Sequence, residues 1–356
     1  MIQAKPNDEL VFLPLGGSGE IGMNLNAYGF GSPDARKWII VDIGVTFGRE
    51  GTTPGVDLIL PDSQYLEDER DNIIGIVLTH AHEDHIGALG WLWPRLKAPV
   101  YATPFTAALV REKLRERGLL EKVPLTEIPL KGQLTLGPFE IDFVTLTHSI
   151  PEPNGLAIRT PLGMVWHTGD WKIDPDPMIG ETTDEAKLRE MAEEGVLAMV
   201  CDSTNVFVEG HAGSEGHVRE RLKEEIAKCK GRVAVTAFAS NVARIESAIL
   251  AAKACGRTVC LVGRSMHRIV GAESALAGMV MFHETHMQGD MATMRELAEV
   301  PVPAGGRAVF APGGRHLMLM ALRAVPRAGD HVTITLIDEA GCRIANKRMS
   351  RWAVMP

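Results

Sequence analysis

The stretch of sequence that decides the fold is His80-Ala81-His82-Glu83-Asp84-His85. It follows the apolar run 72–79, whose β-branched residues predict a buried strand. The polar side chains therefore lie where a strand ends and the chain turns toward a helix. Imidazole nitrogens and carboxylate oxygens are the usual ligands of zinc. With this spacing, one tight turn can offer two ligands to each of two metal ions. A polar loop that is rich in histidine by chance is the alternative, and it does not explain the spacing.

Length and composition indicate a soluble globular chain. Its 356 residues are 45% hydrophobic and 23% charged, enough for a core and for two or three domains. The five cysteines form no C-x-x-C pair, which favours reduced thiols in a cytoplasmic protein. We expect no secretory signal, because no apolar segment follows the basic residue Lys5 near the start, and no membrane contact, because no apolar run approaches the length of a membrane span. The net charge of −8 argues against coating of nucleic acid by bulk electrostatics, but it allows a local positive site.

The pattern of predicted elements divides the chain into three parts. In residues 1–205 strands outnumber helices; the strands are 9–15, 24–30, 37–41, 72–79, 139–146, 156–159, 164–167 and 196–201, and the helices are 106–118 and 184–194. In residues 206–271, helices 215–230 and 241–255 alternate with strands 232–237 and 258–262, which is typical of a parallel sheet. Residues 272–356 are rich in methionine and contain short β runs, such as 306–310 and 331–336, separated by turns. The sequence thus predicts an α/β layered architecture followed by a small all-β unit.

Three further metal-type side chains are expected at or just beyond the ends of strands: Asp42, His148 and Asp170. Each alone is equally consistent with a structural role, but together with the turn at 80–85 they predict one cluster. His167, at the end of its strand, is expected to be structural. The glycine-rich loop 16–22 lacks the order of a dinucleotide or phosphate loop. It is better explained as a tight turn whose backbone passes close to another segment.

The motif H-x-H-x-D-H, followed by a strand-end histidine and a strand-end aspartate, resembles that of the metallo-β-lactamase fold. That fold is an αββα sandwich with a dinuclear zinc site at the edge of its sheets. More narrowly, residues 8–271 resemble ribonuclease J, a β-CASP member of that fold. The segments that carry the resemblance are 15–24, 42–44, 80–85, 167–174, 201–205 and 239–245. We therefore expect a metallo-β-lactamase domain over 1–205 and a partial β-CASP domain over 206–271.

The resemblance to ribonuclease J implies a role for each site residue. Six side chains would bind two zinc ions: His80, His82 and His148 the first, Asp84 and His85 the second, with Asp170 bridging them. The catalytic set would be Asp84, His85, Asp170 and Asp42, the last orienting the ligands. Three residues would lie near the substrate: Asp202, Ser240 and Asn241. A helix-capping role for Ser240 or Asn241 is equally consistent with the sequence.

The activity that the resemblance implies is cytoplasmic hydrolysis of RNA phosphodiester bonds by a metal-bound hydroxide, as an exo- or endonuclease. Composition and spacing alone would indicate only a binuclear zinc hydrolase. Another metallo-β-lactamase-fold hydrolase, acting on a thioester or lactone, is an alternative that segments 201–205 and 240–244 argue against. The oligomeric state stays open, with a homo-oligomer among the alternatives.

The resemblance to ribonuclease J ends near residue 271. Members of that family are longer, and their chain returns after the β-CASP domain with a glycine-flanked histidine that completes the second zinc site. We find no Ser-Gly-His element here, so we expect a weakened second zinc site and impaired activity.

Residues 272–345 resemble instead the carboxyl-terminal part of PCuAC-type periplasmic copper chaperones, which would be a cupredoxin-like β segment. The family's His, Met and H-x-M signature matches His283, Met294, His316 and Met318, and these residue types are suitable ligands for Cu(I). The alternative is that the methionines fill a small β core. The sequence therefore predicts a fusion joined near residue 270. Two alternatives to the hydrolase are therefore kept: the chain binds Cu(I) through this segment, or it is a chimera without a function.

Overall fold

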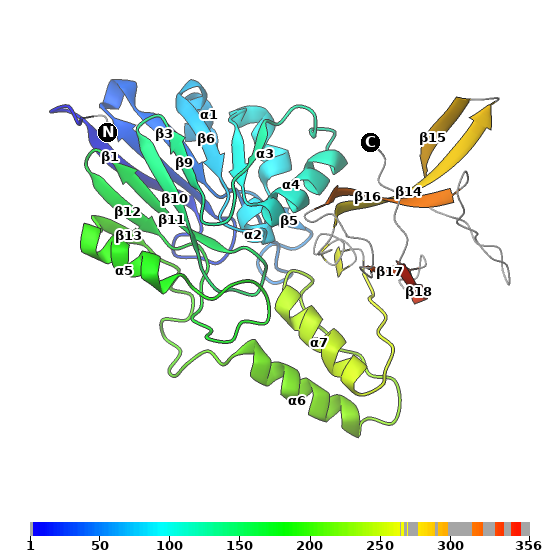
Figure 1. The fold of residues 1–356 in the computed structure, drawn as a ribbon. Helices are drawn as coiled ribbons and strands as arrows, with labels where there is room; N and C mark the ends of the chain where they lie inside the picture. The colour runs from blue at the N-terminus through cyan, green and yellow to red at the C-terminus, as the bar shows by residue number, and fades with distance from the viewer. Residues whose placement is uncertain are drawn as a thin grey trace. The chain divides into compact units, whose positions relative to one another are not determined.

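The computed structural model describes residues 3–263, residues 265, 266 and 269, and five strands of the carboxyl-terminal part. The chain forms two compact units, Met1–Thr258 and Val259–Pro356 (Figure 1). In the part of the chain that the structure describes, no helix has the length and apolar character needed to cross a lipid bilayer.

The first unit contains two main sheets. One has the order β1 (Glu9–Gly16), β2 (Leu25–Gly31), β3 (Lys37–Val41), β6 (Ile73–Val77), β7 (Val100–Ala102) and β8 (Leu125–Glu127). The other has the order β13 (Ala198–Val200), β12 (Gly163–His167), β11 (Asn154–Thr160), β10 (Phe139–Thr145) and β9 (Gln133–Leu136). A short ribbon pairs β4 (Thr46–Phe47) with β5 (Leu58–Ile59). The neighbours from β3 to β8 are parallel, so these strands point to the same edge of their sheet.

The two sheets pack face to face over an apolar core. Residues from both sheets share one buried cluster, which includes Tyr28, Ile39, Phe143 and Leu156. Helix α5 (Glu185–Glu194) covers the outer face of the second sheet, where its Met191 packs with Trp166 and neighbours.

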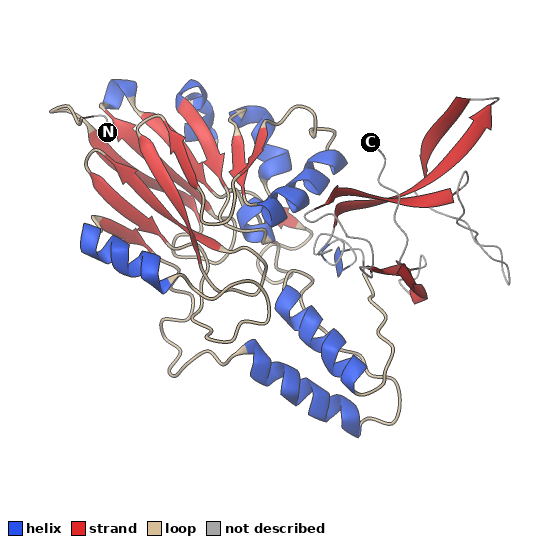
Figure 2. Cartoon of the chain, in the orientation of Figure 1, coloured by secondary structure: helices blue, strands red, loops and turns tan. Residues whose placement is uncertain are grey.

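The remaining helices of the sandwich are α1 (Gln64–Asp68), α2 (Glu83–Ile86), α3 (Leu89–Leu96) and α4 (Pro104–Glu116), with short 3-10 turns at Pro33–Ala35 and Arg70–Asn72. The contacts of α4 with β7 and β8, and of α3 with α4, place these two helices on the first sheet. Figure 2 shows the resulting layers of helix, sheet, sheet and helix. The predicted metallo-β-lactamase sandwich is thereby confirmed.

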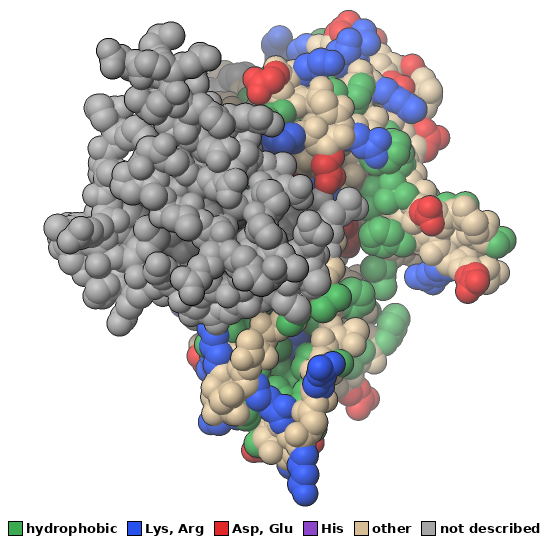
Figure 3. Space-filling view, turned by 90° about the vertical axis from the view of Figure 1, so that its right-hand side faces the viewer, with side chains coloured by type: hydrophobic (Ala, Val, Ile, Leu, Met, Phe, Trp, Pro, Cys, Tyr) green, Lys and Arg blue, Asp and Glu red, His purple; other side chains and the backbone are tan. Residues whose placement is uncertain are grey.

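Residues 206–258 add the helix pair α6 (Glu215–Lys228) and α7 (Val242–Ala254), close to the predicted helices 215–230 and 241–255. The strands predicted over 232–237 and 258–262 are wrong, since no strand is formed there within residues 3–263. The two runs have the β-branched composition of a strand but find no neighbouring backbone to pair with. Val235 and Val262 are consequently 41% and 77% exposed. Hydrophobic side chains also reach the surface in the lower part of Figure 3, the part that holds α6 and α7.

The second unit forms β strands, as the sequence predicts. β15 (Met291–Leu297), β14 (Ala277–Gln288) and β16 (Arg315–Leu322) make an antiparallel sheet, and β17 (Val332–Ile337) pairs with β18 (Arg343–Met349). The predicted strand 306–310 lies outside the described residues. The cupredoxin-like assignment and the domain limits at 205/206 and 271/272 stay predictions.

A buried carboxylate joins α5 to the second sheet. Asp142 on β10 accepts hydrogen bonds from Gln133 Nε2 at 2.9 Å and Arg159 Nη1 at 2.8 Å, and its Oδ2 lies 3.1 Å from Lys187 Nζ on α5. Burial raises the pKa of Asp142, but the bonds from Lys187 and Arg159 outweigh it and hold the pKa below the ordinary value of 3.8. The folded state therefore favours the ionised form of this side chain.

We expect Asp142→Asn to lower the free energy of unfolding by about 1 kcal/mol at pH 7, because Arg159 and Lys187 would then face a neutral amide instead of a carboxylate. Since the folded pKa is depressed, the stabilisation is present above the unfolded value of 3.8 and is lost as pH falls through the folded pKa. Urea unfolding between pH 7 and pH 3.5 measures this stabilisation. The difference in the free energy of unfolding between wild type and Asp142→Asn should become smaller toward pH 3.5. A constant difference would contradict the assignment. Asp71→Asn is the control, because the ion pair of Asp71 with Arg70 is exposed.

Candidate metal centre

The turn at 80–85 is fixed by the segment that follows β3. The backbone N–H groups of Ile43 and Val45 donate to the carbonyl oxygens of His85 and Glu83, at 2.7 and 3.1 Å. Gly44 lies so close that a Cβ there would be 1.6 Å from the carbonyl oxygen of Asp84. A side chain at position 44 would therefore displace the turn, and glycine is required for close approach rather than for flexibility.

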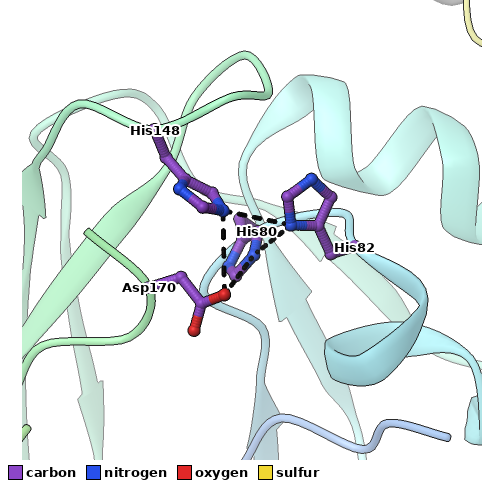
Figure 4. Close-up of side chains that lie close together, drawn as sticks. All are labelled: His80, His82, His148 and Asp170. Carbon is purple, nitrogen blue, oxygen red and sulfur yellow. Dashed lines mark hydrogen bonds and ion pairs between the residues drawn. The ribbon is translucent and has the colours of Figure 1, made fainter. Parts of the chain in front are cut away.

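Four side chains from three strand ends converge on one point (Figure 4). His82 Nδ1 lies 3.0 Å from His80 Nε2 and 3.1 Å from His148 Nε2. Asp170 Oδ2 lies 3.9 Å from His80 Nε2 and 3.7 Å from His148 Nε2. The four candidate ligand atoms all lie within 4.8 Å of one another. The structure thus brings together the residues predicted for the first metal ion.

A second group shares Asp170 with the first. Asp84, His85 and Asp170 each offer one atom within 4.8 Å of the others. His85 Nε2 lies 3.2 Å from Asp170 Oδ1 and 3.7 Å from Asp84 Oδ2. One oxygen of Asp170 therefore faces the first group and the other faces the second. This is the arrangement that a bridging carboxylate needs.

Asp42 contacts both groups by hydrogen bonds, directly at His85 and through Thr79 at His80. It is fully buried, and its φ of +64° is a left-handed conformation that aspartate tolerates better than most residues. Its Oδ1 accepts the N–H of Thr79, and its Oδ2 accepts the hydroxyl of Thr79, both at 2.8 Å. The same Oδ2 lies 2.7 Å from His85 Nδ1. Asp42 thus holds the ring of His85 in place through Nδ1, and its role in orienting the metal ligands stays a prediction.

Hydrogen bonds determine which nitrogen His80 and His82 turn toward the cluster. Thr79 gives its hydroxyl proton to Asp42, so its Oγ1 accepts from His80 Nδ1 at 3.0 Å. The carbonyl oxygen of Ser240, which can only accept, lies 3.2 Å from His82 Nε2. The proton of each neutral ring therefore lies on the outer nitrogen. His80 Nε2 and His82 Nδ1 then face each other as lone pairs, an arrangement that a cation between them stabilises.

The electrostatics of the centre favour neutral inner histidines. Burial is the largest cause that lowers the pKa of His80, His82 and His148, and neighbouring histidines lower it as well; together these effects bring the pKa of His148 to about 3. For His85, burial also lowers the pKa, but the carboxylates of Asp170 and Asp42 outweigh it and the pKa is raised. A metal ion at His85 Nε2 would displace a proton, so binding there is coupled to proton release.

The residues predicted near the substrate take up different positions. Asn241 caps α7, since its side chain accepts the N–H of Arg244 at 2.9 Å. Ser240 presents its carbonyl oxygen to His82. Asp202 accepts the N–H and hydroxyl of Thr204 at 2.9 and 2.6 Å, and it belongs to neither metal-type group among the described residues. The capping alternative therefore holds for Asn241, and the substrate roles of all three residues stay predictions.

The other predicted sites can also be placed. His167 lies outside both groups, buried, with its Nδ1 2.8 Å from the hydroxyl of Tyr28, in keeping with a structural role. The candidate copper residues are His283, Met294, His316 and Met318. Their side chains lie outside the described part of the structure, and only the backbone pairing of their strands is described.

Two contributors to the site have no role in the sequence-based prediction. Asn24 Nδ2 lies 3.2 Å from His85 Nε2 and donates to the carbonyl oxygen of Asp84 at 3.1 Å. A Cβ at Gly17 would lie 2.2 Å from Asn24 Oδ1, so the glycine-rich loop makes room for this side chain. Thr79, next to His80, is the second. The sequence did point toward Asn24 indirectly, because loop 16–22, which precedes it, was expected to pass close to another segment.

Comparison with known proteins agrees with the fold and with the resemblance. A family model described as a beta-lactamase superfamily domain matches residues 38–197. Ribonuclease J of Sinorhizobium meliloti is 54% identical over 265 residues, which are 74% of this chain and 47% of that protein. Ribonuclease J of Thermus thermophilus is 41% identical over 74% of this chain and 46% of its own length. Ribonuclease J of Mycolicibacterium smegmatis is 39% identical over 90% of this chain and 55% of its own length.

The chain thus spans about half the length of the curated relatives it matches. Among solved structures, a protein of unknown function from Enterococcus faecalis has a TM-score of 0.50 at 16% identity, covering 75% of this chain and 68% of that one. This likeness concerns the fold alone. A second family model, described as LpqE-like, matches residues 258–345. The predicted resemblance to ribonuclease J is confirmed for about three quarters of the chain, and the metallo-β-lactamase fold with its His/Asp cluster supports a metal cofactor.

Proposed function

We propose that this chain is a zinc-dependent hydrolase of RNA phosphodiester bonds, of the ribonuclease J type. The observation that carries the proposal is the position of His82 Nδ1, which lies about a hydrogen-bond length from both His80 Nε2 and His148 Nε2; His80 is buried, and His82 and His148 are half-buried. The hydrogen bonds of His80 and His82 leave lone pairs, not protons, on the facing atoms. Such a set is poorly stable by itself, and it fits a divalent cation with nitrogen and oxygen ligands.

The residues of the chain have distinct tasks in this reaction. Two bound zinc ions would supply an acidified water and would neutralise charge on the phosphate. His80, His82 and His148 hold the first position, Asp84 and His85 hold the second, and Asp170 spans both with its two oxygens.

Asp42 keeps the proton of His85 on Nδ1, so that Nε2 remains the binding atom. Because Asp42 also accepts the Thr79 hydroxyl that is bonded to His80, one carboxylate orients a ligand of each position.

RNA is the proposed substrate because the relatives that match this chain are named ribonuclease J. The carbonyl oxygen of Ser240, two residues before α7, contacts His82 of the candidate metal centre, so the RNA backbone would enter from the side of α7. Asp202, Ser240 and Asn241 are kept as candidate substrate residues on this ground. A cytoplasmic location follows from the proposed substrate, and a homo-oligomer remains one alternative for the assembly.

Metal removal tests the proposal directly. The purified full chain should bind two zinc ions, the second more weakly because the sequence has no Ser-Gly-His element, and should cleave 5′-monophosphorylated RNA at a reduced rate, because the two candidate groups would hold the metals that activate water. Dialysis against a chelator should abolish cleavage, and zinc should restore it. Metal-free protein that retains full activity would refute a metal-dependent mechanism. Zinc in both sites without cleavage of RNA would refute the substrate but keep the metal centre.

A second candidate function is Cu(I) binding by the carboxyl-terminal segment. It is favoured by strand pairing: His283 on β14 lies opposite His316 on β16, and Met318 lies opposite Met281, two residues away along β14. Met294 on β15 lies opposite Thr285, two residues away in the other direction. The backbone register thus brings the four residues of the signature into one patch of sheet. Competition with a colorimetric Cu(I) chelator tests this, and one copper per chain that is lost in Met294→Ala and His316→Ala is the expected result.

The two candidate functions reflect a chain of dual ancestry, and we propose that its parts were joined near residue 270. The match to the LpqE-like model at 258–345 supports a separate origin for the carboxyl-terminal part. Long-read sequencing of the gene and its transcript tests this, and two separate reading frames would contradict a natural fusion.

A further inference from the structure

One contact of the candidate metal centre comes from outside its own sandwich. His82 Nε2 lies 3.2 Å from the carbonyl oxygen of Ser240, which precedes α7 by two residues. Because a carbonyl oxygen accepts only, this contact keeps the ring proton on Nε2 and frees Nδ1. The tautomer of a candidate metal ligand therefore depends on where α7 begins.

A partly buried ion pair lies at the start of α7. Glu215, the first residue of α6, accepts from Arg244 on the first turn of α7 through two bonds, at 2.6 Å to Nε and 3.2 Å to Nη2. The side chain of Glu215 is only 8% exposed. Such a bidentate pair fixes direction as well as distance. It joins the first turns of the two helices, and the turn that holds Arg244 is the one capped by Asn241.

The same Glu215 is connected to the loops that carry two other candidate ligands. Its backbone N–H donates to Asp174 Oδ2 at 3.2 Å, and Asp174 Oδ2 lies 2.9 Å from Lys172 Nζ. Lys172 pairs through its backbone with Thr147, the residue before His148, and it follows Asp170 by two residues. The start of α6 is thus tied to the loops of His148 and Asp170, while the start of α7 touches His82.

We propose that the Glu215–Arg244 ion pair is a positioning device for the candidate metal centre, holding the Ser240 carbonyl oxygen against His82 so that Nδ1 faces His80 and His148. The inference rests on the proposed metal function of these residues. Two residues of the partial β-CASP helices, neither of which is a metal ligand, would thereby set the affinity of the three-histidine site. Without the pair, the first turn of α7 keeps its cap and its bond from Ala243 N to Ser149 O at 3.3 Å, but it loses the link that aligns it with α6.

The test uses the full chain and the variants Glu215→Gln, Arg244→Gln and the double variant. Glu225→Gln is the matched control: it removes the same charge from the same helix, and its pair with Lys228 at 2.7 Å is exposed. Long-range proton–nitrogen NMR of ¹⁵N-histidine-labelled, metal-free protein reports which nitrogen of His82 carries the proton. The His82 signal is assigned from the spectrum of His82→Gln. Zinc affinity of the tighter site is measured by competition with a chromophoric chelator.

We expect wild type and Glu225→Gln to show His82 protonated on Nε2, and Glu215→Gln and Arg244→Gln to show a mixture of the two tautomers. Zinc affinity should fall about tenfold in both single variants, the lower range for loss of a partner of a metal ligand. The double variant should lose no more than the worse single variant, because the two residues act as one unit.

Unchanged His82 tautomer and zinc affinity within twofold of wild type, in variants with a normal melting temperature, would overturn the inference. Should Glu215→Gln fail to fold, Arg244→Lys decides, since it keeps the charge but not the two-bond geometry, and it should shift the tautomer in the same direction. A wild-type chain that binds no zinc would refute the proposed function instead. In that case the NMR comparison of metal-free proteins still decides whether the pair positions His82.

Discussion

His82→Ala should abolish RNA hydrolysis, with a loss of more than about 10³-fold, or about 4 kcal/mol of transition-state stabilisation. The reason is the central place of His82: its Nδ1 lies within about a hydrogen-bond length of the inner nitrogens of both His80 and His148. Removal of this ring leaves two nitrogens and one carboxylate oxygen for the first metal ion. Zinc content should fall from two ions per chain toward one, because the group of Asp84, His85 and Asp170 does not include His82.

Metal analysis and cleavage of 5′-monophosphorylated RNA measure the two effects on one sample. His217→Ala is the control, since His217 is an exposed histidine on α6 that belongs to neither group of the described residues. It should keep both zinc ions and full activity. Full activity in His82→Ala would mean that the metal assignment is wrong. A variant with one zinc ion, no activity and an intact cooperative melt would locate the reaction at the three-histidine site.

The sequence was most informative where side-chain chemistry and strand periodicity coincide. Residues 80–85 follow a buried strand, and the parallel pairing of β3 with β6 brings Asp42 to the same edge as the turn. The run before His148 and the strand before Asp170 end near that edge as well. This periodicity predicts the layered α/β architecture and one cluster of metal-type side chains, whereas the αββα fold and the role of each ligand were expected from the resemblance to ribonuclease J.

The contacts of single backbone groups, and the lack of a partner for a predicted strand, could not be predicted in this way. The carbonyl oxygen of Ser240 has the same chemistry as every other carbonyl oxygen, so only the tertiary structure shows that it selects the tautomer of His82. The strands predicted over 232–237 and 258–262 failed for a related reason. Their composition favours extended backbone, but a strand also needs a partner, and no local pattern reveals whether one is present.

Asp42→Asn should have the second largest effect, because it damages stability and metal binding together. The buried carboxylate accepts three hydrogen bonds, from the Thr79 N–H, the Thr79 hydroxyl and His85 Nδ1. Asparagine offers one acceptor oxygen and an NH₂ group, so at least one of these donors would face another donor. We expect the free energy of unfolding to fall by about 2–4 kcal/mol, the cost of one or two unsatisfied buried groups. Asparagine tolerates the left-handed φ of +64°, so backbone strain does not contribute.

The effect on metal binding follows from the two histidines that Asp42 orients. With its acceptor weakened, His85 Nδ1 no longer retains the proton, and the Thr79 hydroxyl no longer points away from His80. Zinc affinity should fall about 10- to 100-fold, as is usual when the partner of a metal ligand is lost. Chemical denaturation and competition with a chelator measure the two quantities separately.

Asp142→Asn separates the two effects, since Asp142 is also a buried, hydrogen-bonded aspartate but lies in neither metal-type group of the described residues. It should lower stability and leave zinc affinity unchanged. If Asp42→Asn likewise lost only stability, Asp42 would be a structural carboxylate and the orientation of His85 would have to come from Asp84, Asn24 and Asp170. If zinc affinity fell with stability, the buried Asp42 would be the element through which β3 and the turn at 80–85 act as one metal-binding unit.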